Sequence, residues 1–139
     1  MRTLPLLFAI TAISACTSLD EIRQSEPIRS GAFGAGYKDM AACIVYETAR
    51  RYTVSSAVFE SGGRAVLTYT SEVSGPIGTM RNPVWEMTIH QDGSPTRSRA
   101  EFRSMKTVIG TTPWADDVWP VVETCAQTLT AHLSPPVQR

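Results

Sequence analysis

Apolar and polar positions alternate most regularly in the middle of the chain, where they predict a pair of antiparallel strands. Over residues 84–90 every second side chain is apolar (W-x-M-x-I), which is typical of a strand with one buried face. A turn at residues 91–95 (QDGSP) leads into 97–108, where Ala100 and Phe102 are expected to point inward. The polar side chains expected on the opposite, solvated face are Glu86, Thr88, His90, Arg99, Glu101 and Arg103.

Helical spacing predicts one helix before these strands and one after them. The first is expected over about residues 38–52, with an apolar stripe made of Ala42, Val45, Tyr46, Ala49 and Tyr52. The second opens at Thr111-Thr112-Pro113, since a hydroxyl cap followed by proline is typical of a helix start. Pro120 is expected to kink this helix and leave a main segment over residues 119–132.

Two further segments carry strand signals between the first helix and the alternating pair. Residues 54–59 and 65–70 are rich in β-branched and aromatic side chains, with Gly62-Gly63 between them as a turn. For residues 54–59 the alternative is the frayed end of the preceding helix. Residues 71–82 are expected to form a loop, because Gly75, Pro76 and Gly78 interrupt them. The order helix, three or four antiparallel strands, helix predicts an α+β two-layer sandwich with both helices on one sheet face.

The chain ahead of the first helix lacks sustained periodicity. Residues 16–37 end in GAFGAG and are predicted to be a flexible tether with an end-to-end distance of about 25 Å. The folded domain is then expected over 38–133, with a short tail at 134–139 that begins with Ser134-Pro135-Pro136. Without residues 1–15 about 124 residues remain, which is the size of one domain.

A short apolar run precedes the first cysteine. Arg2 lies ahead of residues 4–13 (LPLLFAITAI), a run shorter than the roughly 20 residues of a membrane-spanning helix but typical of a cleaved signal peptide. The next residues, Ile13-Ser14-Ala15-Cys16, resemble the lipobox of bacterial lipoproteins. The resemblance implies cleavage after Ala15 and lipidation of Cys16. Because Thr17 rather than aspartate follows, it also implies the outer membrane, with the domain facing the periplasm. An ordinary secretory signal is the alternative.

Two cysteines, Cys43 and Cys125, remain if Cys16 carries lipid. An even remainder in an exported chain predicts one disulfide, here between the first and last helices. In the chain-entropy model, closing so long a loop stabilises the fold by roughly 4–5 kcal/mol. Two buried free thiols are the alternative. A metal or catalytic role is disfavoured, because the cysteines have neither CxxC spacing nor a histidine cluster.

Charge and motif content argue against several classes of protein. The chain carries 13 basic and 13 acidic side chains and lacks the concentrated basic patch of a nucleic-acid-binding protein. It has no G-x-S-x-G nucleophile motif. The Asp92-Gly93 pair beside His90 is ordinary turn chemistry, and Asp116-Asp117 suits the dipole of a helix start. We therefore expect no catalytic residue, no metal ligand and no cofactor.

These observations favour a non-enzymatic binding or accessory module of the cell envelope, attached to the membrane through its N-terminal lipid and contacting an envelope protein. The six polar side chains of the solvated face are the candidate partner-binding residues. Trp114 and Trp119 are a second candidate contact, although covering the sheet edge is the simpler role for them. A small envelope-directed hydrolase or ligand-binding protein, and a purely structural surface lipoprotein, are the alternatives.

Overall fold

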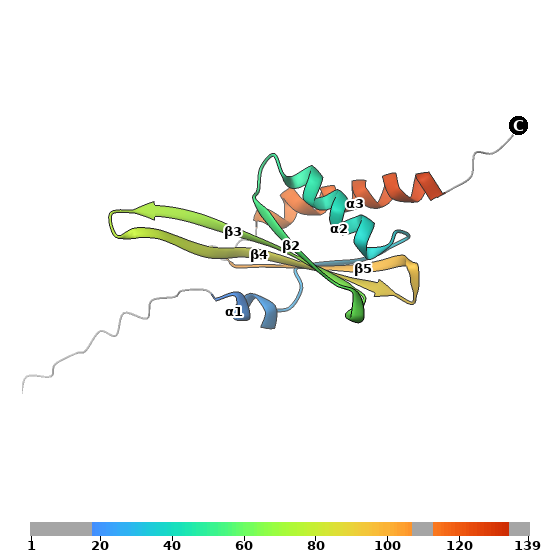
Figure 1. Cartoon of the computed structure of the whole chain (residues 1–139), viewed down its shortest axis with the longest axis horizontal. Helices are drawn as coiled ribbons and strands as arrows, with labels where there is room; N and C mark the ends of the chain where they lie inside the picture. Colours follow the sequence, from blue (N-terminus) through green and yellow to red (C-terminus); the bar gives the residue numbers. More distant parts are fainter. Residues whose placement is uncertain (1–17, 107–112, 134–139) are drawn as a thin grey trace, which may run out of the picture.

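The fold is a five-stranded antiparallel sheet with three helices packed against it (Figure 1). The computed structural model describes residues 18–106 and 113–133. The strand order is β1-β5-β4-β3-β2. The elements in chain order are α1 (Leu19–Gln24), β1 (Arg29–Phe33), α2 (Tyr37–Thr48), β2 (Val54–Phe59), the short 3-10 turn η1 (Glu60–Gly62), β3 (Arg64–Gly75), β4 (Gly78–Asp92), β5 (Ser94–Ser104) and α3 (Pro113–Leu133). The α+β class is confirmed, but the described part of the chain has five strands and three helices instead of three or four strands and two helices.

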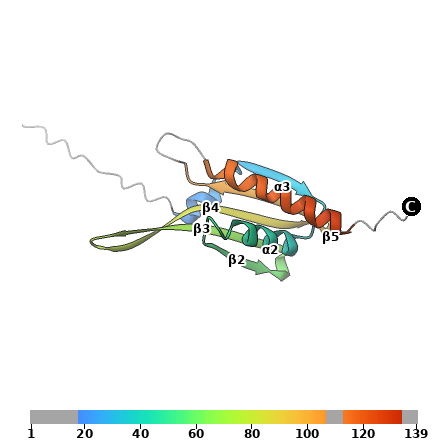
Figure 2. The ribbon, with the colours of Figure 1, turned by 90° about the horizontal axis from the view of Figure 1, so that it is seen from above.

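The helices α2 and α3 lie side by side on one face of the sheet and cover its apolar side chains (Figures 1 and 2). The alternation predicted for residues 84–90 is confirmed, because the inward-pointing side chains of β4 and β5 are fully buried. Together with one side chain of β3, these residues are Leu67, Trp85, Met87, Ile89, Ala100 and Phe102. Such burial is the main favourable contribution to folding.

A disulfide joins the two helices of this layer. Cys43 on α2 and Cys125 on α3 are bonded, with their Cα atoms 5.9 Å apart. Cys125 is buried, and Cys43 packs at the border of the core. The predicted pairing is therefore confirmed.

The first long helix is present, but it ends at Thr48 instead of residue 52, and only Val45 and Tyr52 of the predicted stripe pack against the core. Tyr46 is 77% exposed, and Ala42 and Ala49 also face solvent. The buried residues of α2 follow the spacing i, i+3, i+4, i+7 and i+11: Tyr37, Met40, Ala41, Ile44 and Thr48. Thr48 is tolerated in the core because its hydroxyl donates to the Ile44 carbonyl oxygen at 2.6 Å. Apolar residues occur on two neighbouring stripes of this helix, and the prediction chose the stripe that faces mostly solvent.

The predicted tether over residues 16–37 is wrong for its described part. Residues 19–24 form α1, and residues 29–33 form β1, which pairs antiparallel with β5 from Arg29 opposite Phe102 to Phe33 opposite Ser98. Ile22 of α1 is only 2% exposed. The domain therefore begins well before residue 38.

The predicted loop at residues 71–82 is a continuation of β3 and β4. The two strands remain paired from Thr70 opposite Pro83 to Gly75 opposite Gly78, beyond an irregularity between Tyr69 and Thr70. Gly78 has a φ of 122°, a conformation that favours glycine, so the tight turn explains why glycine stands there.

The last helix also differs from its prediction, since α3 runs over Pro113–Leu133 with Pro120 inside it. Val118 and Val122 are fully buried on either side of the proline, so packing against the sheet holds both parts of the helix. The strand predicted to run to Val108 ends at Ser104, with the next two residues already outside the sheet. The predicted cap at Thr111-Thr112 and the tail at 134–139 lie outside the described residues.

Candidate binding face

The polar side chains predicted to point away from the core lie on the sheet face opposite α2 and α3. The β4–β5 register places them in three cross-strand pairs: Glu86 with Arg103, Thr88 with Glu101, and His90 with Arg99. In the same three rows β3 contributes Thr68, Val66 and Arg64. Antiparallel pairing brings such cross-strand neighbours within contact distance. The prediction therefore named neighbours in space, but it overestimated how far they face solvent.

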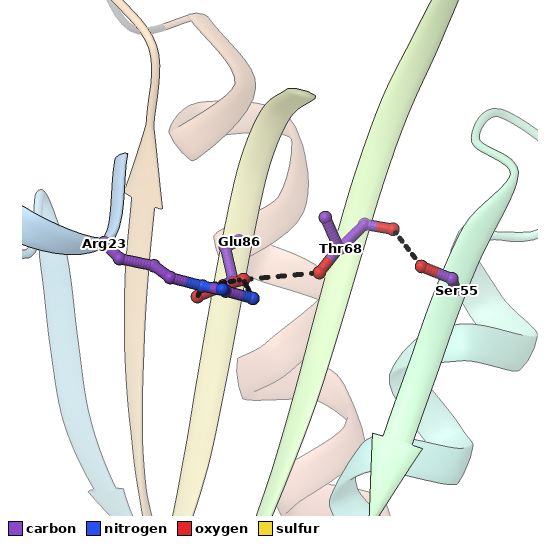
Figure 3. Close-up of polar contacts among 4 residues, drawn as sticks. All are labelled: Arg23, Ser55, Thr68 and Glu86. Atoms are coloured by element: carbon purple, nitrogen blue, oxygen red, sulfur yellow. Dashed lines mark hydrogen bonds and ion pairs between the residues drawn. The ribbon is translucent and has the colours of Figure 1, made fainter. Parts of the chain in front are cut away.

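Glu86 is buried, with a side chain only 5% exposed. Arg23 of α1 donates from Nε to both carboxylate oxygens, at 3.1 and 3.0 Å, and from Nη2 to Oε2 at 2.9 Å (Figure 3). The Thr68 hydroxyl donates to Oε2 at 3.4 Å, and the Ser55 hydroxyl donates to the Thr68 carbonyl oxygen at 3.2 Å. The hydrogen bonds to Glu86 raise the pKa of the Arg23 guanidinium above its ordinary value. Glu86 thus serves to hold α1 and is not an open contact residue.

Arg103 fastens the end of the same helix. Its Nε donates to the carbonyl oxygen of Ser25, the C-cap of α1, at 3.0 Å. Its Nη2 donates to Glu101 Oε2 at 2.8 Å, and the two side chains are only 18% and 26% exposed. The expectation that this whole face is solvated is therefore wrong at the α1 end. The physical reason is that Ile22 and Arg23, within the supposed tether, find partners on distant strands.

Beside α1 the face is hollowed into an open groove with a volume of about 550 Å³, which extends from Arg23 and Glu86 to Phe59 and Arg64. Its lining combines apolar groups such as Val66 with the polar groups of Thr88 and His90. At the rim, the Arg64 guanidinium carbon lies 4.9 Å from the centroid of the Phe59 ring, and Phe59 is 42% exposed. This mixture of an aromatic ring, a cation and hydroxyls suits contact with a polar surface that carries some apolar side chains.

Two of the predicted residues lie at the far end of the face. His90 lines the groove, whereas Arg99 is exposed and is not among the lining residues. The cross-strand neighbours of His90 are Arg64 and Arg99, neither of which can orient the imidazole by accepting its proton. Within residues 18–106 and 113–133, no three His, Cys, Asp or Glu side chains gather to hold a metal ion.

The acidic pair at the start of α3 makes structural contacts. Asp116 accepts a hydrogen bond from Arg29 at 3.2 Å. Asp117 accepts one from the Tyr52 hydroxyl at 3.1 Å and lies 3.5 Å from Arg51 Nη1. Burial, followed by the hydrogen bond to Asp117, raises the pKa of Tyr52 above its ordinary value. These carboxylates join α3 to β1 and to the chain that follows α2.

The tryptophans at the start of α3 pack against the domain. Trp114 and Trp119 are partly buried against the core, and the Trp119 ring lies 6.1 Å from that of Phe33 in β1. Trp119 therefore covers the β1 edge of the sheet.

Sequence reasoning missed the residues that shape the open face from outside the alternating pair. The role of Arg23 could not be predicted from local sequence, because its partner Glu86 is 63 residues away. Arg64 and Val66 could have been found, since β3 was predicted and its outward positions alternate with the buried Ala65 and Leu67.

The predicted lipidation site, Cys16, and the rest of the signal peptide lie outside the described residues. No helix in the described part of the chain is long and apolar enough to cross a membrane. No model of a known protein family matches the chain, and no curated protein is significantly similar to it.

Proposed function

We propose that this protein is a non-enzymatic binding module of the bacterial cell envelope, anchored to the outer membrane by lipid on Cys16, with its domain in the periplasm. The observation that carries the location is the sequence Ile13-Ser14-Ala15-Cys16 after a short apolar run. A disulfide between Cys43 and Cys125 supports it, because disulfides persist in oxidising compartments such as the periplasm.

The groove on the open sheet face is the proposed contact site for an envelope protein. Its mixture of Phe59, Arg64 and hydroxyl groups supports a protein surface as the partner. The alternative of a hydrolase receives no support from His90, whose cross-strand neighbours are both arginines. His132, the second histidine, is exposed in the last turn of α3.

The location is tested by fractionating cells that express the wild type and the Cys16→Ser variant. The wild type should sediment with membranes, and its N-terminal peptide should carry the mass of added lipid. The variant should be soluble in the periplasm or remain uncleaved. A wild-type N-terminus without added mass would refute lipid anchoring.

The groove is tested by cross-linking and capture from solubilised envelopes with Arg64→Glu, using Arg50→Glu as the matched control. Both arginines are exposed, but Arg50 follows α2 on the other side of the sheet. Charge reversal at a contact rim changes association rate and salt dependence, so Arg64→Glu should weaken capture by about two- to five-fold. Arg50→Glu should leave capture unchanged.

Equal capture by the wild type and both variants, at every salt concentration, would show that a partner binds elsewhere. Arg103 is unsuitable for this test because it also holds the end of α1. Both variants should unfold at the same urea concentration as the wild type, which separates a lost contact from lost folding.

A further inference from the structure

The outer part of the β3–β4 hairpin, residues 70–83, projects beyond the rest of the domain and is here called the hairpin arm. Figures 1 and 2 both show it extending past the helices at one end of the sheet. Residues 72–81 are all exposed. An isolated two-stranded hairpin is marginally stable in water, so an arm of this kind gains from a surface to rest on.

The arm gathers exposed apolar side chains near its tip. Ile77 in the turn is 94% exposed, and the cross-strand partners Val73 and Met80 are 58% and 52% exposed. Because side chains alternate along a strand, Glu72 and Arg81 lie on the other face, where they form an ion pair of 2.7 Å. The arm has no other ionisable side chain, so it presents an apolar tip with no net charge.

The chain enters the domain at the same end as the arm. In both views the start of α1 faces the end from which the arm projects (Figures 1 and 2). The contacts of Arg23 with Glu86 and of Arg103 with Ser25 hold α1 on the sheet. Only Thr17 and Ser18 lie between Cys16 and the first residue of α1, so a lipid on Cys16 would keep this end of the domain close to the membrane.

Chain dimensions allow the tip to reach the depth of the lipidated residue. Seven residues of strand separate the level of Glu86 and Arg23 from the turn of the arm. At about 3.3 Å per residue, the turn lies about 23 Å from that level. From the same level, one turn of α1 spans about 6 Å, and the three residue steps back to Cys16 span at most about 11 Å. The tip therefore extends several ångströms further than Cys16 can.

We propose that the tip of the hairpin arm inserts into the lipid headgroup region and gives the domain a second, non-covalent contact with the membrane. This inference rests on the lipid anchor of the proposed function. Apolar side chains of interfacial segments are buried about 5–10 Å into the boundary between headgroups and acyl chains, which matches the extra reach of the arm. Because the arm carries no net charge, its insertion should not depend on anionic lipid.

The test places an environment-sensitive NBD fluorophore at Ile77→Cys in the full lipidated chain, reconstituted in phosphatidylcholine vesicles with and without phosphatidylglycerol. The new cysteine would be the one reactive thiol, because Cys43 and Cys125 are bonded to each other and Cys16 would carry lipid. Ser61→Cys, in the exposed turn between β2 and β3, is the matched control. The mass of the N-terminal peptide is measured on the same samples.

We expect the probe at 77 to emit at shorter wavelength and to be shielded from aqueous iodide in both kinds of vesicle, while the probe at 61 stays in water. A lipidated N-terminus with both probes in water overturns insertion and leaves the anchor intact. The same probes are also measured in native envelopes. Shielding at 77 there but not in vesicles overturns insertion, since a protein would then cover the arm. An N-terminus without lipid overturns the anchor itself and this inference with it.

Discussion

The two faces of the sheet are covered in different ways. On one face α2 and α3 bury a continuous apolar core that includes Trp85 and Phe102, and a disulfide cross-links the two helices. On the other face α1 covers one end with six residues, of which Ile22 is the buried one. Besides this one apolar side chain, its attachment consists of the hydrogen bonds made by Arg23 and Arg103.

This difference separates two kinds of stability in one small domain. Apolar burial is non-directional and is shared among many side chains, so the helix layer does not depend on any single contact. The attachment of α1 is directional and involves few residues, so one substitution can release it. Elements held in this way open more readily than the core does.

The largest effect should come from removing the cross-link of the covered face. Replacing Cys43 and Cys125 together by alanine should lower the free energy of unfolding by about 2–5 kcal/mol, because the unfolded chain without the cross-link has more conformational entropy. Urea unfolding of the variant and of the oxidised wild type measures the difference. Equal midpoints would mean that apolar packing alone holds the two helices together.

A smaller effect is expected at the cover of the open face. Arg23→Ala should cost about 1–3 kcal/mol and expose α1 to hydrogen exchange, because it leaves the buried Glu86 carboxylate without its charged partner. Arg29→Ala is the matched control, since the partner of Arg29, Asp116, is 79% exposed. That variant should change the free energy of unfolding by less than about 0.5 kcal/mol.

Equal losses in the two arginine variants would contradict the view that Glu86 is a buried group that must be neutralised. Faster exchange across the whole sheet in Arg23→Ala, and not at residues 19–24 first, would show that α1 is part of the cooperative core.

The smallest effect concerns the edge of the covered face at high pH. The fold raises the pKa of Tyr52 above its ordinary value of 10.0, by burial and by the hydrogen bond to Asp117. The unfolded chain therefore loses this proton at lower pH than the folded protein does. The resulting stability is complete below about pH 10 and declines as the pH rises through the folded-state pKa. The free energy of unfolding in urea, measured between pH 8 and 11, should therefore fall more steeply with pH in the wild type than in Tyr52→Phe. Equal pH dependence in the two proteins would refute this prediction.

The parts of the fold that could be predicted from sequence are those in which local pattern and burial agree. The β4–β5 pair alternates because one face is buried along its central part. Residues 54–59, for which the sequence left a strand and a frayed helix end as alternatives, form the strand β2. The pairing of Cys43 with Cys125 required only an oxidising compartment and two remaining cysteines.

The parts that could not be predicted depend on distant partners or lack a buried face. α1 is short and is recognisable only through Glu86, which lies 63 residues beyond Arg23. The hairpin arm has no buried face over residues 72–81, so burial imposes no regular alternation there, and its glycines and proline resembled a loop. At the open face, sequence named the outward row of β4 and β5 but could not show that α1 covers part of it.

The position of β1 beside β5 also has a consequence for the order in which the chain folds. β2, β3 and β4 pair with strands adjacent in sequence, so they can assemble without waiting for a distant part of the chain. β1 is made early but must wait for β5, just as Cys43 must wait for a partner 82 residues later. The segment that leads to the N-terminus therefore completes the sheet late. If Cys16 is anchored in the membrane, as we propose, the pairing of β1 with β5 would bring the rest of the domain close to the membrane surface.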